Sequence, residues 1–200
     1  FNLLTGLLEP TAGTIEVDGR DPFRDFDWFR GRIAVVFQND RLLPWRTAIE
    51  NVAYGLELNR GAEAERAKIA GEWLERLGLK GHEDAYPHAL SGGMRQRVSI
   101  ARAFAVDPEI LLCDEPFSAL DELTAGKLRE EFVRLVRENR KTSIFITHSI
   151  SEALTLGERI LVFRPPAYIA LEVRPQDAAT EAERTAMKEA ILGAMTAAAA

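Results

Sequence analysis

The chain has 200 residues, of which 46% are hydrophobic and 28% charged, and its formal net charge is −6. This composition is typical of a globular protein with one domain, or with one domain that carries a modest insertion. The negative charge argues against nucleic acid as a partner, and the single cysteine excludes a disulfide framework and a multi-cysteine zinc site. No apolar run approaches the roughly 20 residues that span a bilayer, so a cytosolic location is the first expectation.

Apolar patterning predicts the elements in chain order. Residues 1–8 carry leucines at helical spacing and end before a proline, and residues 14–18 alternate as a strand before the turn signal Asp18-Gly19. Short apolar runs then predict five further strands, at residues 33–37, 110–113, 143–147, 160–163 and 168–173. The first four resemble strands that are buried on both faces, and the last resembles an edge strand.

Helical patterns lie between these strands. Apolar stripes predict three helices, with buried faces at residues 70–77, 94–105 and 128–136. Gly78 is expected to end the first of them, and Ser149 with Glu152 has the spacing of a capping box that opens a short further helix. Alternating strands and helices predict an α/β fold with a largely parallel, covered sheet.

Two segments depart from this alternation. Residues 40–88 have helical patterning and no strand-like run, which predicts a helical subdomain set into the α/β core. From Pro175 onward the chain is rich in alanine and glutamate and ends in four alanines. That tail is expected to form a weakly anchored helix followed by a frayed end.

Residues 90–97 read Leu-Ser-Gly-Gly-Met-Arg-Gln-Arg and run directly into a predicted helix. Paired glycines expose backbone N–H groups, and the helix N-terminus adds partial positive charge. Together with the Ser91 hydroxyl, Gly92 and Gly93 could therefore bind a phosphate. Taken alone, Ser-Gly-Gly is more often a simple turn with an N-cap, so these residues by themselves leave both interpretations open.

The apolar run at residues 110–113 ends in Asp114, Glu115 and Pro116. An acid at the C-terminal end of a parallel strand lies where α/β folds bind ligands. Neighbouring side chains point to opposite sides, so one carboxylate could hold Mg²⁺ while the other orients or deprotonates water. A solvated turn is the alternative, but it would place two charges beside a dry apolar strand.

Five motifs in this order resemble the ATP-binding-cassette (ABC) ATPases. They are the Q-loop at 37–38, the signature motif at 90–97, the Walker B strand at 110–115, the D-loop at 118–121 and the switch histidine at 147–148. The resemblance covers residues 1 to about 165. It implies a P-loop NTPase-like core with a mainly parallel sheet over residues 1–174, a helical subdomain at about 40–105, and an Ala-rich tail at 175–200.

The resemblance implies ATP and Mg²⁺ as cofactors and gives roles to the matching side chains. Asp114 would bind Mg²⁺, mostly through water, and Glu115 would be the general base. Gln38 would sense the metal and the attacking water, and His148 would contact the γ-phosphate. The reaction would be phosphoryl transfer to water, in which positioning and electrostatics supply nearly all of the catalysis.

The same resemblance implies that the site is shared between two subunits. Ser91, Gly92 and Gly93 would bind the γ-phosphate of a nucleotide that is held mainly by a second subunit. Asp121 would lie at the interface between the two subunits, which would pair head to tail.

The phosphate-binding loop of the family, G-x-x-x-x-G-K-[ST], does not occur in the sequence. Instead, residues 1–15 resemble the stretch that directly follows this Walker A loop. We therefore expect a chain cut just after the loop, with the first strand missing as well. On this expectation the full-length protein is an ATPase, whereas the 200 residues alone are inactive and fold poorly.

The segment that follows Gln38 indicates what the ATPase is coupled to. Pro44 and Trp45 would form a rigid aromatic tip, although Trp45 could equally be a core residue of the helical subdomain. Leu-Leu-Pro-Trp at residues 42–45 resembles the importers of nitrate, sulfonate and taurine, in which this region docks a short helix of the membrane permease. The implied partners are permease subunits and, indirectly, a solute-binding protein, with the ATPase bound peripherally at the cytoplasmic face of the membrane.

Two alternatives remain for the function. Thiamine-precursor importers share much of this sequence, so the solute is open. Non-transport ABC ATPases of DNA repair or of ribosomes are the other alternative. The former carry a long coiled coil between Q-loop and signature, whereas residues 39–89 have no heptad run. The latter carry two cassettes and basic segments, whereas this chain has one cassette and a negative charge.

Overall fold

The computed structural model describes residues 1–57, 62–166 and 168–196. The chain divides into two compact units, Phe1–Ile144 and Phe145–Ala200, and the boundary falls within a strand. The first unit contains the parallel sheet and the helices packed around it, and the second contains a hairpin and its helices.

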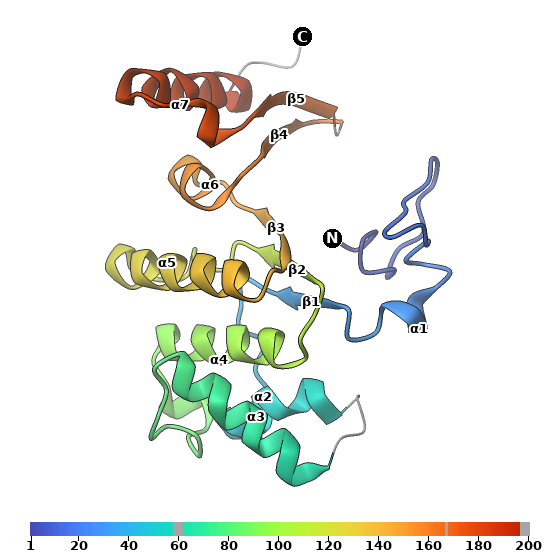
Figure 1. Ribbon diagram of the computed structural model, residues 1–200, viewed down its shortest axis with the longest axis vertical. Helices are drawn as coiled ribbons and strands as arrows, with labels where there is room; N and C mark the ends of the chain where they lie inside the picture. The colour runs from blue at the N-terminus through green and yellow to red at the C-terminus, as the bar shows by residue number, and fades with distance from the viewer. Residues whose placement is uncertain (58–61, 167, 197–200) are drawn as a thin grey trace. The chain divides into compact units, whose positions relative to one another are not determined.

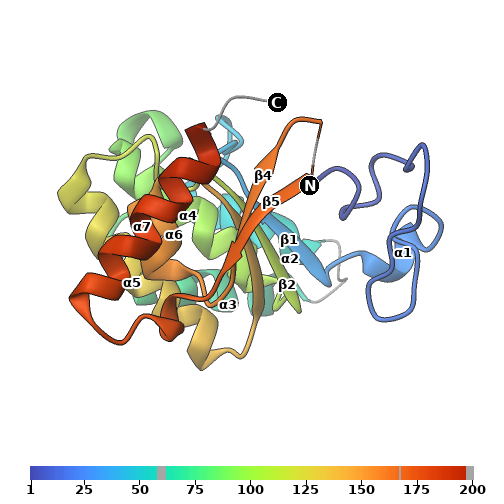
Figure 2. The ribbon, with the colours of Figure 1, turned by 90° about the horizontal axis from the view of Figure 1, so that it is seen from above.

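The sheet of the first unit is built in the order β1-β2-β3. Strand β1 (Ile33–Val36) pairs in parallel with β2 (Ile110–Asp114), and the two lie side by side in Figures 1 and 2. The third strand, β3 (Thr142–Ile146), crosses the boundary between the two units, which falls after Ile144. All three strands were predicted, but only β2 is buried at consecutive positions, because β1 and β3 each keep a more accessible face.

Three helices form the region that was predicted to be a helical subdomain. Helix α2 (Ala48–Glu57) packs against α3 (Glu63–Arg76) and α4 (Gly92–Ala105), and the 3-10 turn η1 (Pro87–Ala89) leads into α4. The predicted end of α3 is confirmed: Gly78 lies just beyond it with φ +71°, a conformation that glycine adopts without strain. Figure 1 shows α2, α3 and α4 grouped together.

Helix α5 (Glu122–Glu138) buries the stripe predicted for it. Its Phe132 meets Phe104 of α4 edge to face at 5.5 Å between ring centroids, and Phe117 at 6.0 Å. All three rings are almost fully buried. This aromatic cluster fixes the segment after β2, which carries the predicted acidic residues, against α5 and α4.

The N-terminal segment differs from its prediction. Residues 1–8 form hydrogen-bonded turns instead of a helix, because so short a segment cannot hold a helix without a packed face. The only helix before β1 in the described chain is the single turn α1 (Phe26–Phe29). Residues 14–18 form no strand either: the predicted Asp18-Gly19 turn, with φ of +52° and +72°, is closed by one isolated bridge, from Val17 to Arg20.

The second unit is a two-stranded sheet with a helix packed on it. Strands β4 (Ile160–Arg164) and β5 (Tyr168–Val173) pair antiparallel, as their predicted positions allow. Helix α6 (Ile150–Leu156) precedes them, and η2 (Pro175–Asp177) and α7 (Glu181–Thr196) follow. The Ala-rich tail does form a helix, and it places Ile191 in a small core with Ile160 and Val162.

Candidate functional site

Ser91 is the N-cap of helix α4, and its Oγ accepts a hydrogen bond of 3.2 Å from the Met94 N–H. Ser91 and Gly92 are exposed, and Gly93 is half-buried. The helix therefore begins at the surface with backbone N–H groups and partial positive charge, as an anion site requires. A simple turn with an N-cap has the same capping geometry. The geometry therefore agrees both with a phosphate-binding turn and with a simple turn.

Asp114 and Glu115 lie at the C-terminal end of β2, where each is partly accessible. Glu115 has φ +45°, in the left-handed region that non-glycine residues rarely adopt. The turn after it is closed by Ser118, whose N–H and Oγ both donate to the Glu115 carbonyl, at 3.2 and 3.0 Å. The preceding residue, Cys113, is fully buried, and burial raises the pKa of its thiol, which keeps the strand neutral up to the two acids.

Asp121 is the N-cap of α5, and its carboxylate accepts a 3.0 Å hydrogen bond from the Thr124 N–H. Hydrogen bonds from Thr124 hold the pKa of the exposed Asp121 carboxyl below its usual value. The start of α5 also touches the start of α4, since a Cβ added at Gly93 would lie 3.0 Å from the Thr124 methyl group. The structure thus brings the predicted segment 91–93 close to Thr124, the residue that Asp121 of the predicted D-loop caps.

Gln38 follows β1 and is exposed. The residues on either side of Gln38 are hydrogen-bonded to α4 through two side chains, Arg95 and Gln96, which come shortly after the Ser-Gly-Gly sequence. Gln96, which is buried, donates from Nε2 to the Phe37 carbonyl at 3.3 Å, and Arg95 Nε lies 2.9 Å from the Asp40 carboxylate. The helix that begins at Ser91 therefore holds the chain on both sides of Gln38.

A third side chain completes this attachment. Arg102, two turns further along α4, donates to the carbonyls of Asp40 and Arg41 at 2.8 and 2.9 Å. Burial lowers the pKa of its guanidinium. None of Arg95, Gln96 and Arg102 was predicted to belong to the site, although the first two lie within the segment 90–97.

His148 belongs to the second unit, in the short connection between β3 and α6, and it is exposed. Ser149 caps α6 by accepting from the Glu152 N–H at 3.3 Å, which confirms the predicted cap. The Glu152 carboxylate accepts from the Thr147 hydroxyl at 2.6 Å, and the Ser149 N–H donates to that same hydroxyl at 3.0 Å.

Comparison with known proteins identifies the family to which these motifs belong. The family model described as "ABC transporter" matches residues 1–118, more than half of the chain. The chain belongs to the ABC transporter family. The matched range includes Gln38, the segment 91–93, Asp114 and Glu115, and ends before Asp121 and His148.

Individual relatives of this ABC family member are similar over most of the chain. An uncharacterised ABC transporter ATP-binding protein of Methanocaldococcus jannaschii is 46% identical over 81% of this chain and 59% of its own length. A taurine import ATP-binding protein of Rhizobium johnstonii is 48% identical, over 82% and 62%. A glycine betaine/proline betaine ATP-binding protein of Salmonella typhimurium is 43% identical, over 81% and 42%. The chain thus spans about 40 to 60% of the length of these curated relatives.

A solved structure of the family has the same fold. It is the dimeric, post-hydrolysis state of an ATP-binding cassette bound to ADP and phosphate, with a TM-score of 0.77 and 36% identity. The match covers 87% of this chain and 78% of the other. The predicted α/β, ABC-type fold is thereby confirmed, and the fold is one that binds adenine nucleotide in that protein.

The acidic end of β2 in this ABC family member has a side chain of the kind that could hold Mg²⁺. Among the described residues, no three His, Cys, Asp or Glu side chains cluster closely enough to form a metal cage. Asp114 offers a single, partly accessible carboxylate at the end of β2. One carboxylate with water and substrate phosphates is the ligand set that Mg²⁺ commonly takes, and no cage is needed.

Trp45 lies at the tip of the loop between Gln38 and α2, and 70% of its surface is exposed. The interpretation of Trp45 as a core residue of the helical region is therefore wrong, and the interpretation as an aromatic tip fits. The apolar anchor of this loop is Leu42, which is buried.

Within the described chain, no helix is long and apolar enough to cross a membrane.

Proposed function

We propose that the chain is the ATP-binding and hydrolysing part of an ABC importer, which acts as a head-to-tail pair at the cytoplasmic face of a membrane. The observation that carries this proposal is the pair Asp114 and Glu115 at the end of buried β2, in the same unit as the exposed Ser91 start of α4. Import ATP-binding proteins for taurine and nitrate, 48% and 42% identical to this chain, support the coupling to uptake.

In this proposal the two acids divide the chemistry between them. Glu115 is the general base that accepts a proton from the attacking water, while Gln38 orients that water. Asp114 would hold Mg²⁺, and the ion would supply charge neutralisation for the transferred phosphoryl group. His148 would hydrogen-bond the γ-phosphate, and its side chain is exposed.

The second half of each site comes from the paired subunit. Ser91, Gly92 and Gly93 direct their hydroxyl and N–H groups at the γ-phosphate of the nucleotide on the partner, and Asp121 lies at the interface. The exposure of Ser91 and Gly92, and a solved relative whose title describes a dimer with ADP and phosphate, support this pairing.

For the solute, we propose the nitrate, sulfonate and taurine class, imported through permease subunits that receive it from a solute-binding protein. The taurine relatives and the Leu-Leu-Pro-Trp segment support this choice. Glycine betaine relatives at 42 to 46% identity are the competing class. Uptake of labelled taurine, nitrate, glycine betaine and a thiamine precursor by a deletion strain complemented with the natural gene discriminates among these solutes.

Replacement Glu115→Gln in the protein made from its natural gene tests the catalytic proposal. The amide keeps the shape of the side chain but cannot accept the proton, so ATP hydrolysis should fall about 100-fold or more while ATP affinity stays the same. Glu109→Gln, just before the opposite end of β2, is the matched control and should leave hydrolysis unchanged. Full hydrolysis by Glu115→Gln would remove the residue from its role.

A further inference from the structure

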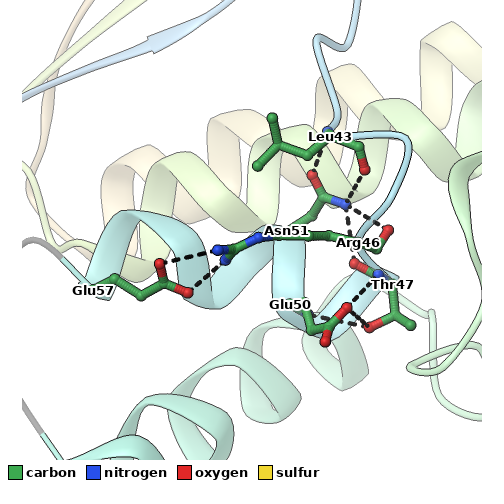
Figure 3. Close-up of polar contacts among 6 residues, drawn as sticks. All are labelled: Leu43, Arg46, Thr47, Glu50, Asn51 and Glu57. Atoms are coloured by element: carbon green, nitrogen blue, oxygen red, sulfur yellow. Dashed lines mark hydrogen bonds and ion pairs between the residues drawn. The ribbon is translucent and has the colours of Figure 1, made fainter.

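Asn51, in the first turn and a half of α2, has no exposed surface and makes four hydrogen bonds to one loop (Figure 3). Its Oδ1 accepts from the Leu43 N–H at 2.7 Å. Its Nδ2 donates to the carbonyls of Leu43, Arg46 and Thr47 at 3.2, 3.0 and 3.0 Å. A single buried amide thus pairs with the backbone at both ends of the loop 43–47. Removing it would take away the partner of the Leu43 N–H and of the Arg46 carbonyl, whereas the Leu43 and Thr47 carbonyls also accept from the backbone N–H groups of Arg46 and Asn51, at 3.1 and 2.9 Å.

Two further contacts, visible in Figure 3, tie the same loop to α2 from the solvent side. Thr47 and Glu50 form a capping box, in which the Glu50 carboxylate accepts from the Thr47 N–H at 2.7 Å and the Glu50 N–H donates to the Thr47 hydroxyl at 3.4 Å. Arg46 forms an ion pair with Glu57 and lies over the ring of Tyr54 at 4.9 Å.

Between these attached residues lie Pro44 and Trp45, which are exposed. Proline restricts its own backbone, and the backbone on either side is held by Asn51, so the backbone position of Trp45 is largely determined before any partner binds. An exposed tryptophan on a fixed backbone is the kind of residue that dominates binding interfaces, because little backbone conformational entropy is lost on contact.

We propose that Asn51 is the positioning residue for partner docking: its four hydrogen bonds hold the loop 43–47 in the shape in which Trp45 contacts the membrane subunit. This inference rests on the proposed function, which supplies the membrane subunit as the occupant. It adds a residue that touches neither nucleotide nor partner and acts only through the loop.

Backbone amide exchange tests the positioning without any partner. In Asn51→Ala, the Leu43 N–H loses its acceptor and should exchange about tenfold faster or more. The Ala48 N–H, bonded to the Ala85 carbonyl at 2.9 Å, reports whether the start of α2 keeps its packing against the chain at residue 85 and should keep its protection. Glu57→Gln is the matched control on the same helix, since it releases Arg46 and should leave the Leu43 N–H protected.

Asn51→Asp supplies the second variant. It keeps an acceptor for Leu43 but removes the donors to the three carbonyls, so Leu43 should stay protected while Trp45 gains motion. That motion is read as a lower fluorescence anisotropy in a chain whose Trp28 and Trp73 are replaced by phenylalanine. Unchanged Leu43 exchange in Asn51→Ala, or loss of Ala48 protection in both variants, would overturn the positioning role.

Binding to vesicles that contain the membrane subunits tests the docking step. Trp45→Ala should weaken binding about tenfold or more, and Asn51→Asp should weaken it by a smaller factor. If Asn51 acts through Trp45, adding Asn51→Asp to Trp45→Ala causes no further loss. Additive losses would contradict the inference, and so would full binding by Trp45→Ala. Failure of the ATPase proposal is distinct, because it would appear in the Glu115→Gln assay.

Discussion

At the residue scale, the two glycines that begin α4 have different surroundings. A Cβ at Gly92 would have its nearest neighbour, Arg95 Nη2, at 3.9 Å, which is ordinary contact. A Cβ at Gly93 would stand 3.0 Å from the Thr124 methyl group, which is too close without adjustment. The chain itself therefore has room for a side chain at position 92 but not at position 93. A loss of activity on substitution of Gly92 would consequently come from what binds there.

This difference predicts that Gly92→Ala folds with unchanged or slightly higher thermal stability, because alanine is the better helix former by about 0.5–1 kcal/mol. If the proposed shared site is right, ATP hydrolysis should nevertheless drop, since the new methyl group would stand where a phosphate held by the paired subunit approaches the backbone. Gly93→Ala should lower the melting temperature, and Thr124→Ser, which removes the facing methyl, should restore it. Normal hydrolysis by Gly92→Ala would argue against the shared site.

At the element scale, α4 does two tasks with one helix. Its exposed first turn presents Ser91 and Gly92, and its partly buried face holds the chain around Gln38 through Arg95, Gln96 and Arg102. A movement of α4 would therefore carry both the Ser91 turn and the Gln38 segment. Arg102 is central to this attachment, because its guanidinium satisfies two carbonyls at once.

Arg102→Met should therefore destabilise the protein by about 1–3 kcal/mol, the cost of leaving the Asp40 and Arg41 carbonyls unpaired. Urea unfolding, followed by circular dichroism, measures this loss. Arg134→Met is the control: Arg134 is well exposed on α5, and its change should stay within about 0.5 kcal/mol. Equal effects of the two substitutions would mean that the carbonyl contacts of Arg102 contribute nothing to stability.

At the scale of the whole molecule, the chain has two units with separate cores. The core of the second unit is small: Ile160, Val162 and Ile191 are its buried members, and they join the hairpin to α7. Ile191 is only 2% exposed, so the helix formed by the Ala-rich tail has one main anchor in this core.

Ile191→Ala should therefore lower the stability of the second unit by about 2–5 kcal/mol. Amide exchange of β4 and β5 reports this loss, while the amides of α4, which belong to the first unit, should change much less. Leu192→Ala, at the adjacent and exposed position, is the matched control and should have little effect. Equal destabilisation of both units would show that they unfold as one.

Much of the fold follows from local pattern. The apolar runs at 33–37, 110–113 and 168–173 predict their strands because short runs rich in β-branched and other apolar residues are typical of β-strands. Residues 1–8 mislead because periodicity alone cannot say whether a face has anything to pack against. Asp114 and Glu115 could also be singled out from the sequence, because charges that directly follow a buried apolar strand are costly unless solvent or a bound group compensates them.

The sequence by itself determined the family motifs and their order, and it predicted the chemistry of Asp114, Glu115 and the Ser91 turn, because these depend on residue type and spacing along the chain. Only the tertiary structure decided that Trp45 is exposed, that Asn51 holds its loop, and that Arg95, Gln96 and Arg102 hold the chain around Gln38. These contacts join residues up to 62 positions apart. No local preference encodes such a pair, because the hydrogen bonds exist only once the helices have packed.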